Sequence, residues 1–197
     1  MKIALFGATG RVGRVVYDHI GHDARCLVRK NRNEGTDILG NVLDSEAVAS
    51  TVKGCEAVIS CLNTDKEDVL SRSMPIILDA MRKEGISRII TCGTAGILNA
   101  SNSNGLYRFQ SSESKRRSTT AAEDHLSAYL MLKASGMDWT IVCPTYLPEG
   151  ERVGRFRTTE EVLPENGTSI SVYDTADFMV QVLEERWYIK KRVGISY

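Results

Sequence analysis

The residues that decide the fold are "KIALFGATGRVGRVV", positions 2–16, where four apolar residues lead directly into three glycines. The glycines stand at positions 7, 10 and 13, and an apolar-periodic segment follows them. A glycine turn between a strand and a helix brings free backbone N–H groups and the positive helix end together. This arrangement binds anions, and it suits the pyrophosphate of a dinucleotide.

Each glycine has its own expected task. Gly7 makes the tight turn, Gly10 lets the backbone approach the phosphates, and Gly13 lets the helix pack close to the strand. The G-x-x-G-x-x-G spacing is one residue longer in its first gap than the commonest dinucleotide fingerprint, and a purely structural turn is the alternative. Its place after the first apolar run favours the dinucleotide. We therefore expect cofactor contacts from Gly7, Ala8, Thr9, Gly10, Arg11, Val12 and Gly13.

Beyond this turn, short apolar runs alternate with longer segments of helical period, the pattern of a parallel sheet covered by helices. We expect strands at 3–6, 24–28, 37–39, 57–60, 88–92, 139–143 and 192–195. We expect helices at 12–20, 45–52, 69–83, 119–134 and 175–185, with N-caps at Asp44, Thr119 or Thr120, and Asp174. The sequence therefore predicts an α/β fold: a Rossmann-type doubly wound parallel sheet in a single domain over residues 1–197.

Composition narrows the class of partner. Lys and Arg together number 25, as do Asp and Glu, so the formal net charge at pH 7 is zero. This balance argues against nucleic acid or an anionic membrane bound by bulk electrostatics, and no apolar run approaches the roughly 20 residues that span a bilayer. We expect a monomer or small homo-oligomer whose partner is a small-molecule acceptor.

Cysteine usage points to the compartment. The chain has five cysteines, an odd number, with no C-x-x-C spacing. Such residues are more often buried, reduced thiols than disulfides or metal ligands. We therefore expect a cytoplasmic protein without a metal site.

The end of the second expected strand, "CLVRKNR" at 26–32, bears on the choice of dinucleotide. A carboxylate at this edge would accept hydrogen bonds from the adenosine ribose and favour NAD(H). The chain instead has Arg29 and Lys30, two cations suited to a 2′-phosphate. We expect NADP(H), with NAD(H) as the alternative if these are ordinary surface bases.

Residues 99–117 are polar, rich in Ser and Asn, and without sustained period. A long loop in a compact domain is usually functional or disordered, so we expect residues 97–118 to border the active site. The basic cluster at 115–117 is expected to be a solvated approach to the next helix in preference to an anion site.

A family resemblance runs almost from end to end. It rests on "GATGRVG" at 7–13, "LVRK" at 27–30, "GNVLD" at 40–44, "AVISCLNT" at 57–64, "RIITCGTAG" at 88–96, "LKASGMDWTIVCP" at 132–144 and "DTADFM" at 174–179. In these motifs the chain resembles the single-domain NAD(P)H-binding branch of the atypical short-chain dehydrogenase/reductase superfamily. Within that branch it is similar to the biliverdin reductase B / flavin reductase proteins and to bacterial NADH-flavin reductases.

The resemblance implies further cofactor contacts. Adenine contacts would come from Asn41 and Val42, with Asn41 standing where the family more often has Asp. Backbone contacts to the ribose and pyrophosphate would come from Cys61, Leu62, Asn63 and Thr64. The nicotinamide would be lined by Pro144, Thr145, Tyr146 and Leu147.

Tyr129 and Lys133 match the Tyr-x-x-x-Lys pair that supplies the proton in conventional short-chain dehydrogenases. Geometry argues against this role, because a helix that follows a parallel strand starts near the site and runs away from it. Lys133 lies eight residues after His125, about 12 Å further along the axis, and Gly136 ends the helix soon afterwards. We therefore expect the match to be accidental.

Three other groups are candidates on the acceptor side. Thr94, just past the strand at 88–92, aligns with a serine that the biliverdin reductase B relatives place beside the nicotinamide. His125 lies where related proteins place a lysine or histidine, and a surface histidine without a role is the alternative. Tyr146 stands where that relative carries a histidine.

None of these groups is a strong acid or an activated nucleophile by sequence. Hydride transfer to a flavin or bilin depends chiefly on positioning, since water supplies the proton, whereas reduction of a simple ketone needs a committed donor. We therefore expect an NADPH-dependent oxidoreductase that passes hydride to a flavin-like or other planar conjugated acceptor. The alternative is an NADP(H)-sensing regulator without turnover. A nucleotide-sugar epimerase is less favoured, because such enzymes use the Tyr–Lys pair and an added C-terminal domain.

Overall fold

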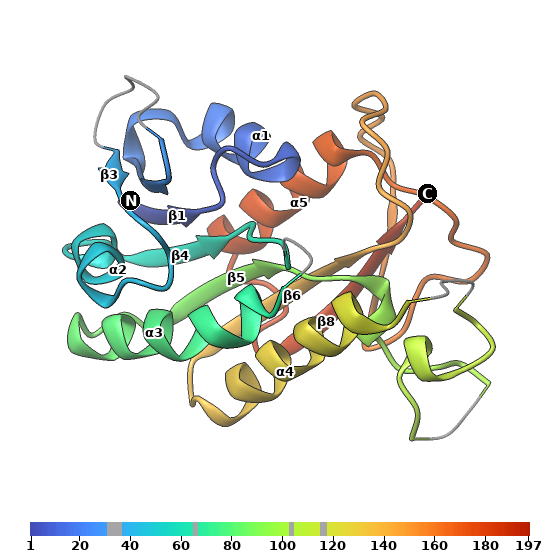
Figure 1. Cartoon of the computed structure of the whole chain (residues 1–197). Coiled ribbons are helices and arrows are strands. Elements are labelled where there is room, and N and C mark those ends of the chain that lie inside the picture. The colour runs from blue at the N-terminus through green and yellow to red at the C-terminus, as the bar shows by residue number, and fades with distance from the viewer. Residues whose placement is uncertain (31–36, 65–66, 103–104, 115–117) are drawn as a thin grey trace.

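Figure 1 shows the computed structural model, which describes residues 1–30, 37–64, 67–102, 105–114 and 118–197. Within these residues one eight-stranded sheet has the order β3-β2-β1-β4-β5-β6-β8-β7. The strands are β1 (Ile3–Phe6), β2 (Ala24–Val28), β3 (Ile38–Leu39), β4 (Ala57–Ser60), β5 (Arg88–Cys92), β6 (Asp138–Pro144), β7 (Arg157–Glu160) and β8 (Lys191–Ser196). Neighbouring strands are parallel except for β7 with β8. The order of the first six strands is that of the Rossmann fold, which confirms the expected fold class.

Five helices of the described chain cover both faces of the sheet (Figure 1). Helices α1 (Arg11–Ile20) and α5 (Val172–Glu184) pack together on one face. Helices α2 (Ser45–Val52), α3 (Val69–Lys83) and α4 (Thr120–Ala134) form a row on the other. No helix in the described part of the chain is long and apolar enough to cross a membrane.

The core consists of two apolar clusters, one on each face of the sheet. Strands β1 and β4 are buried at every position, because both of their faces are covered by helices. Helix α1 buries Val12, Val15 and Val16 against the sheet, and its polar residues face outward. Periodicity in the sequence therefore leads directly to the layered packing.

The structure corrects two expectations in the last third of the chain. Helix α5 begins at Val172, earlier than the expected 175, because Ser171 caps it: its Oγ accepts from the N–H of Asp174 at 3.0 Å. Asp174, the expected cap, instead accepts hydrogen bonds from the N–H groups of Val153 and Gly154. Strand β7 was not expected, and it adds an antiparallel edge beyond β8. Its sequence, Arg-Thr-Thr-Glu, has no apolar run that would mark it as a strand.

At the other helix starts the outcome is mixed. Asp44 caps α2 as expected by accepting from the N–H groups of Glu46 and Ala47. Thr119 occupies the N-cap position of α4, but its hydroxyl donates to Glu123 and does not cap the backbone.

The segment expected as a loop at 97–118 carries short-range structure where it is described. It follows the 3-10 turn η2 (Ala95–Ile97) and contains a second, η3 (Arg108–Gln110). Asn99 and Tyr107 form an isolated antiparallel bridge between them. The basic cluster predicted at 115–117 lies outside the described residues.

Candidate functional site

The carboxyl ends of β1, β2, β4, β5 and β6 meet at one edge of the sheet. Phe6 lies opposite both Leu27 and Ser60, and Ser60 lies opposite Thr91. The chain proceeds from β1 to β2 and β3 on one side and returns to β4 on the other. Ligands of open α/β sheets bind where the order reverses in this way. The expected contacts after each strand therefore converge on one crevice.

The glycine turn packs closely against the residues that follow β4 and against the start of α1. Gly7 has φ +81°, and a Cβ there would lie 2.6 Å from the carbonyl carbon and oxygen of Cys61. A Cβ on Gly13 would lie 2.1 Å from the Gly7 oxygen. Gly7 thus makes the tight turn and Gly13 allows the close helix, as the sequence predicts. Gly10 has ordinary extended backbone, with φ −78° and ψ 169°, so its phosphate task stays a prediction.

The residues of the turn fit a dinucleotide pyrophosphate. Among the described residues no side chain caps α1, because its N-cap is Gly10, and the first turn carries no acidic residue. The N-cap residues of α3 and α4 likewise form no side-chain cap, whereas those of α2 and α5 do. The first-turn N–H groups of α1 and its positive end therefore face the crevice without a competing carboxylate. The exposed Arg11 adds a guanidinium there, whose Nη1 donates to the oxygen of Leu147 at 2.8 Å.

On the adenosine side, Arg29 and Lys30 follow β2 directly and are exposed. Asn41 is also exposed, but its Oδ1 accepts from the N–H of Leu43 at 3.0 Å, which leaves the amide NH₂ as its donor toward a base. Val42 is buried in the core, so a contact to adenine would come from its backbone.

Past β4 and β5 the crevice is lined by thiols that are not nucleophiles. Burial raises the pKa of Cys61 well above its usual value, and the neighbouring Cys92 raises it further. Burial also raises the pKa of Cys92 to about 12, although Arg11 opposes this shift. Both thiols therefore stay protonated at neutral pH. Beyond them Asn63 is exposed, and its Oδ1 accepts from the N–H of Thr64, which is buried.

A small cavity lies between the sheet and helices α3 and α4, at the edge where the acceptor contacts are predicted. It measures about 20 Å³, room for about one water molecule. Its polar lining includes Ser60, Thr91, Tyr129 and the half-buried His125. Thr94 follows β5, and its hydroxyl accepts from the N–H of Gly96 at 3.3 Å. The structure therefore brings Thr94 and His125 to the same edge of the sheet.

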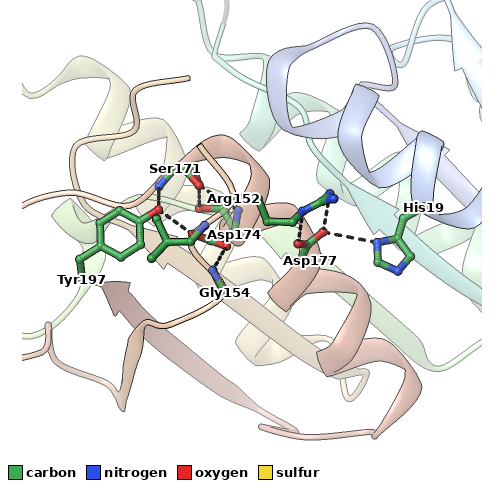
Figure 2. Close-up of polar contacts among 9 residues, drawn as sticks. His19, Arg152, Gly154, Ser171, Asp174, Asp177 and Tyr197 are labelled. Atoms are coloured by element: carbon green, nitrogen blue, oxygen red, sulfur yellow. Dashed lines mark hydrogen bonds and ion pairs between the residues drawn. The ribbon is translucent and has the colours of Figure 1, made fainter. Parts of the chain in front are cut away.

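Past β6, the predicted nicotinamide contacts begin a segment that is fastened to α5. Pro144 is buried, Tyr146 is 69% exposed, and Thr145 has a buried Oγ1 with no partner among the described residues. The carboxylate of Asp174 holds the N–H groups of Val153 and Gly154 at 3.0 and 2.9 Å, as Figure 2 shows for Gly154. Hydrogen bonds to Asp174 therefore fasten this segment to α5.

The hydrogen bonds to Asp174 lower the pKa of its carboxyl group. Burial alone would raise the pKa of this carboxyl, but hydrogen bonds from Tyr197, Gly154, Val153 and Ser171 outweigh burial and hold the pKa below its usual value. The Tyr197 hydroxyl donates at 2.6 Å. Figure 2 also shows a second tie, the ion pair of Arg152 with Asp177 on α5.

The Tyr129–Lys133 pair does not have the geometry of a proton relay. Tyr129 is 4% exposed, and its ring meets Trp139 edge-on at 5.6 Å between ring centroids. The Lys133 ammonium lies over the ring, 6.0 Å from its centroid, and α4 ends one residue later. Desolvation raises the pKa of Tyr129, the opposite of what an activated donor needs.

Sequence reasoning missed Ser60 and Thr91, which line the cavity. Both are hydroxyl residues near the carboxyl end of an otherwise apolar strand. Because strand ends form the ligand edge of such sheets, a polar residue at this place was the available signal.

Comparisons with known proteins identify the family of the chain. A family described as NAD(P)H-binding matches residues 7–186 of the chain. A curated relative from Bacillus subtilis (strain 168), named "Uncharacterized sugar epimerase YhfK", is 26% identical over 94% of this chain and 89% of its own length. The structure of a "Putative exported protein" from Burkholderia pseudomallei has a TM-score of 0.87 and 28% identity over the whole of both chains. A "putative NADH-flavin reductase" from Streptococcus pneumoniae TIGR4 has a TM-score of 0.86 and 22% identity over 100% of this chain and 99% of that one, and at this identity it shows the fold alone.

Proposed function

The chain belongs to the NAD(P)H-binding family, and we propose that it is an NADPH-dependent reductase. Its acceptor is a flavin-like or other planar conjugated molecule. The bound nicotinamide would supply the hydride. The glycine turn and the uncapped start of α1 would hold the pyrophosphate, and Arg29 with Lys30 would select the 2′-phosphate.

One observation carries the choice of acceptor: the position of Tyr129. A buried, raised-pKa tyrosine with a lysine over its ring face is not a committed proton donor. Reduction of a simple ketone develops an alkoxide and needs such a donor. A conjugated ring system spreads the developing charge, so orientation by Thr94, His125 and Tyr146 and a proton from water are sufficient.

Stopped-flow oxidation of NADPH with free flavin, quinone and bilin acceptors tests the proposal. We expect at least one acceptor to oxidise NADPH faster than the enzyme-free background. Tyr129→Phe is the matched control, because it removes only the hydroxyl and should leave this rate unchanged. Absence of oxidation with all three classes would overturn the proposed reaction, and loss of the rate in Tyr129→Phe would restore the Tyr–Lys mechanism.

The same observation is compatible with an NADP(H)-sensing regulator without turnover. Such a protein would bind NADPH tightly, transfer hydride to none of the acceptors, and retain a protein partner only in one redox state of the cofactor. A sugar epimerase, the activity in the name of the Bacillus subtilis relative, is disfavoured by the Tyr129–Lys133 geometry. We also propose a cytoplasmic location, on the free state of all five cysteines.

A further inference from the structure

Arg192 on β8 is a buried cation with many partners. It is 3% exposed and forms an ion pair with Glu161, to which its Nε donates at 2.9 Å. Its guanidinium also lies 4.5 Å from the ring centroid of Tyr129 and 5.3 Å from that of Tyr107. A buried arginine of this kind is held by its geometry, since a planar fork matches several acceptors at once.

Two of its partners lie in the segment that follows Thr94. Nη1 donates to the carbonyl oxygen of Ile97, the last residue of η2, and Nη2 donates to Oδ1 of Asn99 at 2.8 Å. Glu161 takes part as well, because its carbonyl oxygen accepts from the N–H of Asn99 at 2.8 Å. The Arg192–Glu161 pair thus fastens the beginning of the segment to the sheet.

Hydrogen bonds within the segment after Thr94 join its beginning to its later residues. The N–H of Ala100 donates to the oxygen of Leu106, and the N–H of Arg108 donates to the oxygen of Leu98. In Figure 1 the described part of the segment forms the loop beside the start of α4, and His125 lies in the second turn of that helix. Arg192 therefore lies beneath one wall of the acceptor side.

We infer that Arg192 is a positioning residue: through Ile97, Asn99 and Tyr107 it holds residues 94–102 and 105–108 in place as the acceptor wall. This inference rests on the proposed function, because the wall has a role in the reaction only if an acceptor binds beside it. Arg192 touches neither cofactor nor acceptor in this assignment. Its loss would displace Thr94 and the wall while the glycine turn remains intact.

Arg88 offers a matched control. It is also a 3% exposed arginine inside the sheet, and it donates to the oxygens of Asp138, Val182 and Trp187. These partners lie at the amino end of β6, near the end of α5 and in the turn before β8, away from the acceptor wall. Removing either arginine leaves buried acceptors unsatisfied, so both variants lose stability, but only one releases the acceptor wall.

The experiment compares Arg192→Met, Arg192→Lys and Arg88→Met in the full chain. Amide hydrogen exchange reports on the N–H groups of Asn99, Ala100 and Arg108. Steady-state kinetics give the acceptor KM, and titration gives the NADPH Kd. For Arg192→Met we expect faster exchange at these three amides, an acceptor KM raised about 10- to 100-fold, and an unchanged NADPH Kd. Arg192→Lys, which keeps the charge, should show a smaller increase in both the amide exchange rates and the acceptor KM. Arg88→Met should lower Tm and leave the exchange rates and the acceptor KM unchanged.

Two results would overturn the inference: exchange at the three amides no faster in Arg192→Met than in Arg88→Met, or faster exchange with an unchanged acceptor KM. If the wild-type protein oxidises NADPH with no acceptor, the proposed function fails, and the exchange comparison alone decides whether Arg192 fastens the wall. Should Arg192→Met not fold, Asn99→Ala removes one wall contact while the Arg192–Glu161 pair persists, and the same comparison applies.

Discussion

Replacing Gly13 or Gly10 by alanine should affect different properties of the protein: its stability in the first case and its cofactor binding in the second. A Cβ on Gly13 would lie 2.1 Å from the oxygen and 2.7 Å from the carbon of the Gly7 carbonyl. These are backbone atoms, so no side chain can rotate away, and α1 must move by about 1 Å. Overpacking of this kind costs about 1–3 kcal/mol, which lowers Tm by about 2–12 °C in a domain of this size.

Gly10→Ala should leave the stability of the fold nearly unchanged and weaken the binding of the cofactor. Its Cβ would lie 3.3 Å from the Gly7 oxygen and 3.9 Å from the Cys61 oxygen, contacts that a shift of a few tenths of an ångström relieves. The same Cβ would occupy the space through which a pyrophosphate approaches the turn. If the clash between this Cβ and the pyrophosphate also costs about 1–3 kcal/mol, the affinity for the cofactor falls by about 5- to 150-fold.

Thermal unfolding without cofactor and NADPH titration of both variants separate the two effects. We expect a lowered Tm for Gly13→Ala alone, and weakened NADPH binding with near wild-type Tm for Gly10→Ala. Wild-type NADPH affinity in Gly10→Ala would refute the reasoning about the phosphate approach. Equal losses of Tm in the two variants would refute the claim that a Cβ at position 13 clashes with the Gly7 carbonyl group.

Three more predictions follow from the same edge of the sheet. Arg29→Ala should weaken NADPH binding by about 10- to 150-fold through loss of a charge-assisted contact of about 1.5–3 kcal/mol, while NADH titrations stay unchanged; equal losses would contradict the 2′-phosphate role. Cys61 and Cys92, whose pKa values are raised by burial, should resist alkylation by iodoacetamide at neutral pH in the folded protein and react after unfolding, as mass spectrometry will report. The lowered pKa of Asp174 contributes stability that is present above its ordinary value of about 3.9 and lost as pH falls through the folded value; Asp174→Asn should therefore be less stable at neutral pH and show a flatter decline of Tm on acidification.

Most of the sheet was predictable because its strands obey local rules. Strands β1, β2, β4 and β5 begin and end at the residues that apolar runs indicate. Parallel strands covered on both faces are continuous apolar runs, and their ends are marked by the change to polar or glycine residues. The end of α4 was predictable because Gly136, which follows it, takes a positive φ of 77°.

The remainder depends on contacts between distant residues. Strand β7 is held by backbone pairing with β8 and not by its own apolar pattern. Asp174 looks like a helix cap, and only the fold shows that its carboxylate serves a loop about twenty residues earlier in the chain. Arg192 is similar, since nothing around it in sequence indicates partners near position 97. The candidate site was predictable at strand ends, where topology brings residues together, and unpredictable where one side chain joins several elements.

The place of β8 in the sheet sets an order of assembly. It lies between β6 and β7, although it is the last strand in chain order. Domains generally fold as units, and this sheet cannot be completed before β8 has been made, because β8 pairs with both β6 and β7. Arg192 lies on β8. Ile97 and Asn99 therefore gain their buried guanidinium partner only when the last strand of the sheet is available.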